Sequence, residues 1–79
     1  MRILWTEPAG RVFRRLSRSA QLAILERLDV ISEFPEMYPV RDRQPYAGFR
    51  YFFTSGWCVS YTTAQDMLII LAVFAARAG

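Results

Sequence analysis

The second half of the chain constrains the fold most, because apolar runs there alternate with short polar breaks. Residues 48–61 are rich in aromatic and β-branched side chains, and the run is broken by Ser55-Gly56. A two-residue break of this kind favours a tight β-hairpin. A third apolar run, residues 67–74, follows the polar pair Gln65-Asp66. The pattern therefore predicts three consecutive strands joined by two tight turns.

The same pattern predicts where these strands lie in the sheet and which side chains share a face. Residues 67–74 are apolar at odd and even positions alike, which predicts a central strand buried on both faces. A two-residue turn divides the preceding strands into two faces. One face would carry Arg50, Phe52, Trp57, Val59 and Tyr61, and the other Phe49, Tyr51, Phe53, Cys58, Ser60 and Thr62. We expect one face to pack on helices and the other to be the working surface, and alternation alone does not decide which.

The first half of the chain has a short strand pattern, residues 2–6, followed by a helical period. Thr6 is a suitable N-cap for a helix that carries apolar side chains on one side. Those side chains are Ala9, Val12, Phe13 and Leu16, and the opposite side carries Arg11, Arg14, Arg15 and Arg18. The sequence therefore predicts an amphipathic helix with a cationic outer surface.

A second helix is predicted from Ser17 or Ser19 to about Phe34, where Pro35 ends it. Its expected apolar face consists of Ala20, Ala23, Ile24, Leu28, Val30, Ile31 and Phe34. Leu22 and Leu25 lie on its polar side and are candidate contacts for a partner. The fold class is therefore α+β, in the order β-α-α-β-β-β, with two antiparallel helices packed on one face of a small antiparallel sheet.

Length and composition limit the function. The 79 residues form one domain, residues 1–79, and 53% of them are hydrophobic, which predicts an apolar patch reserved for a partner. The single cysteine, Cys58, excludes an internal disulfide and fits a reducing compartment. Because the chain has no histidine, a His/Cys zinc site and a Ser-His or Cys-His nucleophile are excluded. We expect no metal and no cofactor.

The sequence predicts a cytoplasmic protein without membrane contact. Few apolar residues precede Thr6, too few for the core of a signal peptide. The longest apolar run, residues 67–76, is ten residues long, about half of what a membrane-spanning helix requires.

All ten basic residues are arginines, and the net charge is +3. Two explanations stay open: recognition of phosphate or carboxylate groups, or the codon usage of a GC-rich genome. The arginines of the first helix, with the aromatic side chains of the sheet, would also suit a small non-enzymatic RNA- or DNA-binding module. A charge of only +3 argues against strong nucleic-acid affinity.

The order of elements, with an arginine just after the last strand, resembles the RelE/ParE superfamily of bacterial type II toxins. The residues that carry the resemblance span nearly the whole chain. They are Leu4-Trp5-Thr6-Glu7-Pro8-Ala9, Ile31-Ser32-Glu33-Phe34-Pro35, Tyr38-Pro39, Gly48-Phe49-Arg50, Val59-Ser60-Tyr61, Asp66, residues 68–73 and Arg77.

The resemblance implies a small α+β toxin that a cognate antitoxin wraps and neutralises in a toxin–antitoxin hetero-oligomer. We expect the antitoxin to contact Arg11, Arg14, Arg15, Arg18, Leu22 and Leu25. Two mechanisms occur on this fold. RelE-like members cut messenger RNA on the ribosome with a basic patch on the sheet, whereas ParE-like members poison DNA gyrase by protein contact.

The sequence departs from the nuclease pattern at several points. Aromatic residues 51–53 stand where nuclease members carry lysines, Cys58 stands where they often carry arginine, and no tyrosine or histidine follows Phe74. If the protein is a nuclease, Arg50 and Arg77 would clamp the phosphate and Tyr61 would transfer the proton, with Arg41 or Arg43 as further phosphate contacts. Because arginine does not deprotonate, acid–base cleavage is poorly supported. The sequence therefore favours the ParE-like branch and inhibition of gyrase by binding.

Overall fold

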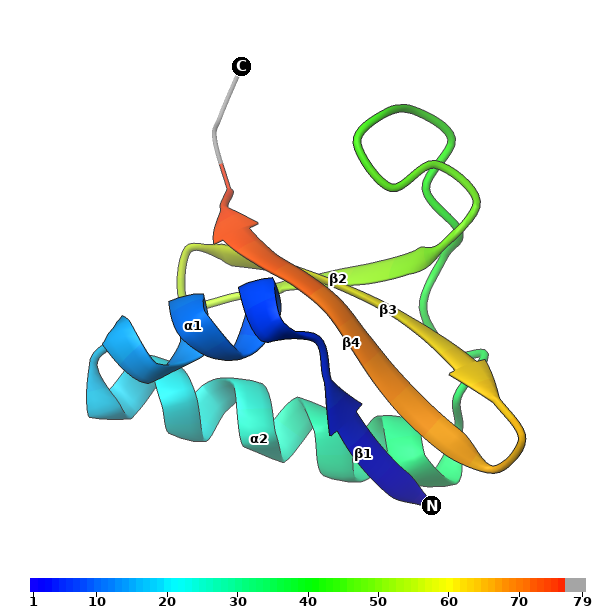
Figure 1. The fold of residues 1–79 in the computed structure, drawn as a ribbon, viewed down its shortest axis with the longest axis horizontal. Coiled ribbons are helices and arrows are strands. Elements are labelled where there is room, and N and C mark those ends of the chain that lie inside the picture. Colours follow the sequence, from blue (N-terminus) through cyan, green and yellow to red (C-terminus); the bar gives the residue numbers. More distant parts are fainter. Residues whose placement is uncertain (77–79) are drawn as a thin grey trace.

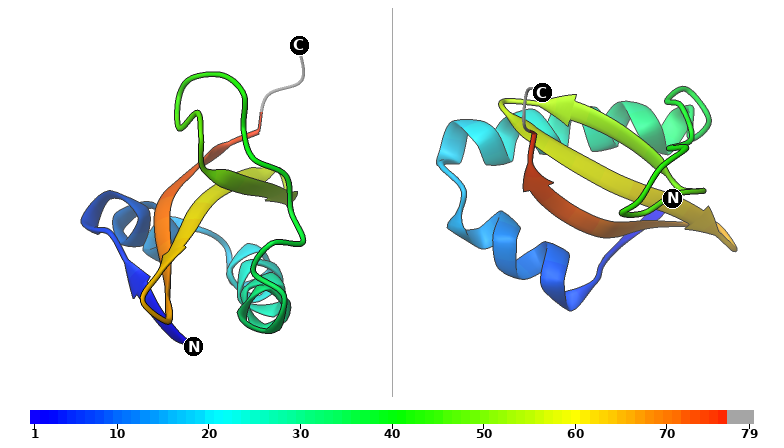
Figure 2. Two further views of the ribbon diagram at one scale, coloured as in Figure 1. Left: turned by 90° about the vertical axis from the view of Figure 1, so that its right-hand side faces the viewer. Right: turned by 90° about the horizontal axis from the view of Figure 1, so that it is seen from above.

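The computed structural model describes residues 1–76 and has the predicted order β-α-α-β-β-β (Figure 1). Its elements are β1 (Arg2–Trp5), α1 (Glu7–Arg15), α2 (Arg18–Glu33), β2 (Arg50–Thr54), β3 (Trp57–Ala64) and β4 (Met67–Ala75). Both helices lie on the same side of the sheet (Figures 1 and 2). This arrangement confirms the predicted α+β fold. Within the described residues, no helix is both long and apolar enough to cross a bilayer.

The four strands form one sheet in the order β1-β4-β3-β2, so β4 is central as predicted. The pairs β2–β3 and β3–β4 are antiparallel, whereas β1 runs parallel to β4. The sheet is therefore mostly antiparallel, with one parallel pair at the edge. The second hairpin pairs β3 with one edge of β4. The N-terminal strand β1 pairs with the opposite edge of β4 and satisfies the backbone hydrogen-bonding groups there.

Both hairpins close with turns whose two central residues have positive φ. These angles are 51° and 79° at Ser55 and Gly56, and 49° and 65° at Gln65 and Asp66. Positive φ at both central positions matches the right-handed twist of the flanking strands. The first turn sets the register that pairs Thr54 with Trp57 and Phe53 with Cys58.

Side-chain caps fix where the helices begin. The Thr6 hydroxyl accepts a hydrogen bond from the Ala9 amide at 3.4 Å and donates to the Leu71 carbonyl at 2.9 Å. Of the two predicted caps for α2, Ser17 is used, and its hydroxyl accepts from the Ala20 amide at 3.2 Å. Caps of this type contribute about 1 kcal/mol each. The Thr6 hydroxyl thus joins the start of α1 to the central strand.

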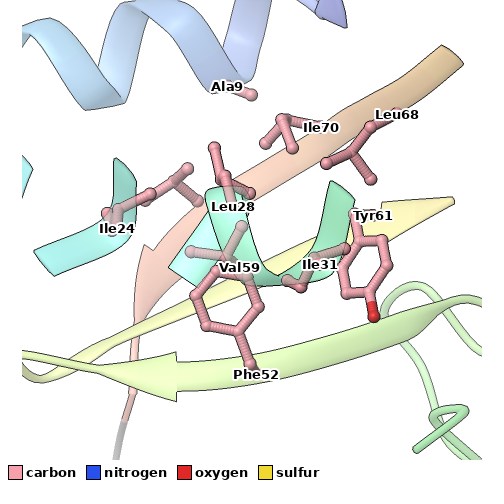
Figure 3. Close-up of a cluster of buried hydrophobic side chains, with 10 residues drawn as sticks. Ala9, Ile24, Leu28, Ile31, Phe52, Val59, Tyr61, Leu68 and Ile70 are labelled. Atoms are coloured by element: carbon pink, nitrogen blue, oxygen red, sulfur yellow. The ribbon is translucent and has the colours of Figure 1, made fainter. Parts of the chain in front are cut away.

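The core lies between the helices and the sheet (Figure 3). Ala20, Ile24, Leu28 and Ile31 are the buried residues of α2. Two members of the predicted apolar face are exposed instead, because Val30 lies about 100° around the helix from Ile31 and Phe34 is already the C-cap. The side chains that meet α2 and α1 are Phe52, Val59, Tyr61, Leu68 and Ile70, with Val73 completing the cluster.

Two leucines on α2 test this packing. Leu28 is fully buried, whereas Leu25 is 41% exposed. We expect Leu28→Ala to lower the free energy of unfolding by about 2–5 kcal/mol, because it removes buried methyl groups and leaves a cavity. A domain of this size has roughly 4–12 kcal/mol in total. The matched control Leu25→Ala should cost less than about 1 kcal/mol. Urea unfolding followed by circular dichroism measures both, and equal losses would contradict the proposed core.

Candidate functional site

The strand register decides which face of the sheet is free. The alternating set with Phe52, Val59 and Tyr61 packs against the helices. The opposite set therefore faces away from them, and we call that side the open face. It carries Tyr51 and Phe53 of β2, Cys58 and Ser60 of β3, and Phe74 of β4.

The segment that joins α2 to β2, residues 34–49, starts beside the end of α2, and its loop then rises on the side of the sheet away from the helices (Figure 2). We call it the connector. Its backbone is fixed around Arg41, whose amide donates to the Phe49 carbonyl and whose carbonyl accepts from the Gly48 amide, both at 2.8 Å. The Tyr51 amide also donates to the Pro39 carbonyl at 3.2 Å. At φ 89°, Gly48 adopts a backbone conformation that other residues rarely reach. The connector is therefore attached to the first residues of β2.

The Arg41 side chain is the centre of the open face. Its guanidinium carbon lies 5.6 Å from the centroid of the Tyr51 ring and 5.8 Å from that of Phe74. Its Nε donates to the Arg43 carbonyl at 3.1 Å. The Tyr46 ring stacks on Phe74, with centroids 6.2 Å apart and planes inclined by 18°. Cation–π contacts contribute about 0.5–1 kcal/mol each at exposed sites. Among residues 1–76 the Arg41 guanidinium has no acidic partner, and these contacts position it.

Two hollows flank this cluster. One, of about 510 Å³, is lined by Arg41, Asp42, Arg43, Tyr51 and Phe53. The other, of about 480 Å³, is lined by Arg41, Arg43, Pro45, Phe53, Phe74, Ala75 and Ala76. Phe53 lines both hollows and is 56% exposed. Guanidinium groups beside exposed rings can bind carboxylates, phosphates or flat apolar groups.

Cys58 lies beneath this cluster and is fully buried. Burial raises the pKa of its thiol, and the nearby Arg41 guanidinium opposes that shift less strongly. The thiolate is the reactive form of cysteine. Cys58 is therefore a packing residue rather than a nucleophile.

Arg50 and Tyr61, two of the predicted catalytic residues, are directly paired across β2 and β3. They lie on the helix face, however, and not with Arg41 and Arg43. Tyr61 is fully buried, and its hydroxyl donates to the Pro35 carbonyl at 3.0 Å. The Arg50 guanidinium donates to the Tyr38 carbonyl at 2.6 Å.

Burial raises the pKa of the Tyr61 phenol, and Arg50 opposes that shift. A raised pKa keeps the phenol protonated, but its proton is already donated to the Pro35 carbonyl. The role of Tyr61 is therefore structural: its buried side chain joins β3 to the start of the connector. The small cleft beside it measures about 150 Å³ and is lined by Pro35, Val40, Gly48, Phe49, Arg50, Tyr61, Thr62 and Thr63. The third predicted catalytic residue, Arg77, lies outside the described residues.

The predicted partner-binding side chains are all exposed on the two helices. Leu22 and Leu25 of α2 are 48% and 41% exposed. On α1, the Arg11 guanidinium pairs with the Glu7 carboxylate at 2.6 Å, which is the one ion pair among residues 1–76. The remaining predicted contacts are Arg14, Arg15 and Arg18, which are exposed. Their contact with an antitoxin stays a prediction.

Sequence reasoning missed the joint position of Arg41, Tyr46 and Phe74. The register signal was only partial: the two-residue turn at Gln65-Asp66 alone would place Val73 opposite Cys58, and a β-bulge between Ser60 and Tyr61 shifts the register so that Phe74 lies there instead. The position of Arg41 had no such signal, since its contact with the sheet depends on how the proline-flanked connector folds back. The sequence suggested Arg41 only as a further phosphate contact.

The two buried titratable groups predict how stability depends on pH. The pKa values of Cys58 and Tyr61 are raised in the folded protein from their ordinary values of 9.0 and 10.0. The unfolded chain therefore ionises first, so stability is fully present below about pH 9 and is lost as the pH rises through the folded pKa values. Urea midpoints measured from about pH 7 to about pH 11 should fall. The double variant Cys58→Ala/Tyr61→Phe should flatten the alkaline limb, and an unchanged limb in that variant would contradict the assignment.

Comparison with known proteins places this geometry in a known fold. No family model matches the sequence, and no curated protein is similar to it in sequence. The structure is similar to that of the isolated E. coli RelE toxin, with 15% identity and a TM-score of 0.81 over 99% of this chain and 86% of that one. It is also similar to the intact E. coli RelBE toxin–antitoxin complex, with 17% identity and a TM-score of 0.77 over 98% of each chain. The chain therefore has the fold of the RelE toxin, as the sequence resemblance implies.

Proposed function

We propose that this protein is the toxin of a bacterial type II toxin–antitoxin system and that it arrests growth by binding a protein target. DNA gyrase is the target to test first. The fold supports the first part of the proposal, because one of the similar structures is a complex of a toxin with its antitoxin. The exposed leucines and arginines of the helices supply a surface for such an antitoxin.

The chemistry of the open face carries the second part. Arg41 lies between the rings of Tyr51 and Phe74, above a buried and neutral thiol. RNA cleavage by acid–base catalysis needs a positioned group that exchanges a proton near neutral pH. Arginine does not exchange its proton there, and the chain contains no histidine. Exposed rings and guanidiniums are instead the residue types that dominate protein interfaces.

Cleavage of ribosome-bound messenger RNA is the second candidate function. One observation favours it: Arg41 and Arg43 line both hollows of the open face beside the exposed Phe53 ring. This combination also suits phosphate contact and base stacking. In this case the open face would bind the RNA through Arg41 and Arg43. Arg50, to which the sequence resemblance assigns the phosphate clamp together with Arg77, lies on the helix face instead.

Expression in bacteria without an antitoxin tests the proposal. We expect growth to stop, transcripts to stay intact by primer extension, and DNA-damage signalling to rise. In a supercoiling assay, the purified protein should inhibit gyrase. Codon-phased cuts in ribosome-bound transcripts that disappear in Arg77→Ala would overturn the binding mechanism in favour of the nuclease.

A pair of charge-matched variants tests whether the open face is responsible. Arg41→Gln should weaken gyrase inhibition at least about tenfold, equivalent to about 1.4 kcal/mol, because it removes the central guanidinium of the face. Arg2→Gln removes the same charge from the exposed edge strand β1 and should leave inhibition unchanged. Immunoblots check that both variants accumulate equally in cells. Equal inhibition by both purified variants would exclude the open face as the binding surface.

A further inference from the structure

The positive charge of this protein is concentrated on one short segment. Residues 7–18 contain four arginines and one glutamate, whereas the remaining six arginines are balanced by six acidic residues. The whole net charge of +3 therefore resides on α1 and its junction with α2. This segment lies on the helix side of the sheet, away from the open face (Figure 2).

A cleft of about 450 Å³ lies beside these charges, between the second half of α1 and the start of β3. Its lining consists of Arg11, Val12, Arg15, Leu16, Ser17 and Trp57. The Val12, Leu16 and Trp57 side chains are half-buried and pack against the core, so they form an apolar floor that is already in place.

Two guanidiniums accompany that floor. Arg11 and Arg15 are exposed and lie four residues apart, so they project from the same side of α1. Within residues 1–76, the Arg11 guanidinium pairs only with the Glu7 carboxylate, and both side chains are largely exposed. Exposed pairs of this kind contribute little stability, so a carboxylate from another molecule can compete with Glu7 at little cost.

We infer that this cleft binds an acidic segment of a partner protein, which inserts one bulky apolar side chain between Val12, Leu16 and Trp57. Its flanking carboxylates pair with Arg11 and Arg15. An apolar anchor in a preformed pocket supplies most of the affinity, and the charge pairs fix the orientation. Only the identity of the partner rests on the proposed function, under which the segment belongs to the antitoxin.

The composition of the cleft distinguishes this occupant from a nucleic acid. A phosphate backbone is bound through charge, so it would use all four arginines of residues 11–18 and would not need the apolar floor. A segment with an apolar anchor uses the floor and the two arginines that line it. Arg14 and Arg18 do not line the cleft.

Trp57 itself reports on occupation of the cleft. The chain has two tryptophans, and Trp5 packs on Phe13 with ring centroids 4.6 Å apart. Trp5→Phe therefore leaves Trp57 as the single tryptophan, whose emission can be excited apart from that of the tyrosines. The probe is a synthetic peptide of about eight residues, long enough to span about 25 Å, with glutamates on both sides of one central leucine. We expect a saturable blue shift of the Trp57 emission. The same peptide with alanine at its centre, or with glutamine for every glutamate, should bind at least about tenfold more weakly.

Two double variants with equal charge change provide the matched control. Arg11→Gln/Arg15→Gln should weaken peptide binding at least about tenfold. Arg14 and Arg18 are predicted contacts for other parts of the antitoxin and do not line the cleft, so Arg14→Gln/Arg18→Gln should weaken binding of this short peptide less than about threefold. All four substitutions are at exposed positions, so thermal unfolding should be nearly unchanged. Equal weakening by both double variants would overturn the inference in favour of nonspecific charge attraction.

Two further outcomes would also overturn it. One is the absence of any Trp57 response to the leucine peptide. The other is tighter binding of a single-stranded DNA oligonucleotide, lost equally in both double variants, which would identify a nucleic-acid surface. Because these measurements use the purified chain, they fail or succeed independently of growth arrest in cells, which tests the proposed function.

Discussion

The position of β4 between β1 and β3 is the constraint on which the rest of the structure depends. Thr6 attaches the end of β1 to this strand twice, through its amide to the Ile70 carbonyl at 3.1 Å and through its hydroxyl to the Leu71 carbonyl at 2.9 Å. The two residues joined by the hydroxyl are 65 positions apart. Closing so long a loop costs conformational entropy, and burial of Ala9, Leu68 and Ile70 between helix and sheet offsets that cost. In the finished fold, both helices pack on the same face of this sheet (Figures 1 and 2).

Most of the fold could be predicted because it is encoded locally. The polar pairs Ser55-Gly56 and Gln65-Asp66 mark both hairpin turns, and the caps Thr6 and Ser17 mark both helix starts. Two features are not local and were beyond the sequence. The parallel pairing of β1 depends on which edge of β4 the hairpin leaves free. The rotation of α2 about its axis, which buries Ile31 and leaves Val30 exposed, depends on how the helix packs against the sheet.

The candidate site was harder to predict than the fold, for a physical reason. Alternation along β2 and β3 gives two sets of side chains, but a set is identified as the working surface only after the helices are placed. Arg50 and Tyr61 belong to the set that the helices cover, and both donate to connector carbonyls. Arg41 contributes to the other set from outside the sheet, through a contact with Tyr51 and Phe74 that no periodicity describes.

The connector has a consequence for how such a surface diversifies. The core consists of side chains from the helices and strands, whereas the connector contributes only the half-buried Tyr38 ring to its edge. Backbone hydrogen bonds at residues 39–41 hold the connector itself, and its Arg41 guanidinium and Tyr46 ring rest on rings of the open face. Substitutions at the tip of the connector can therefore change the charge and shape of this face without creating a cavity in the core. Under the proposed function, target recognition and stability are therefore encoded in separate parts of the chain, so selection can act on the first while the second is preserved.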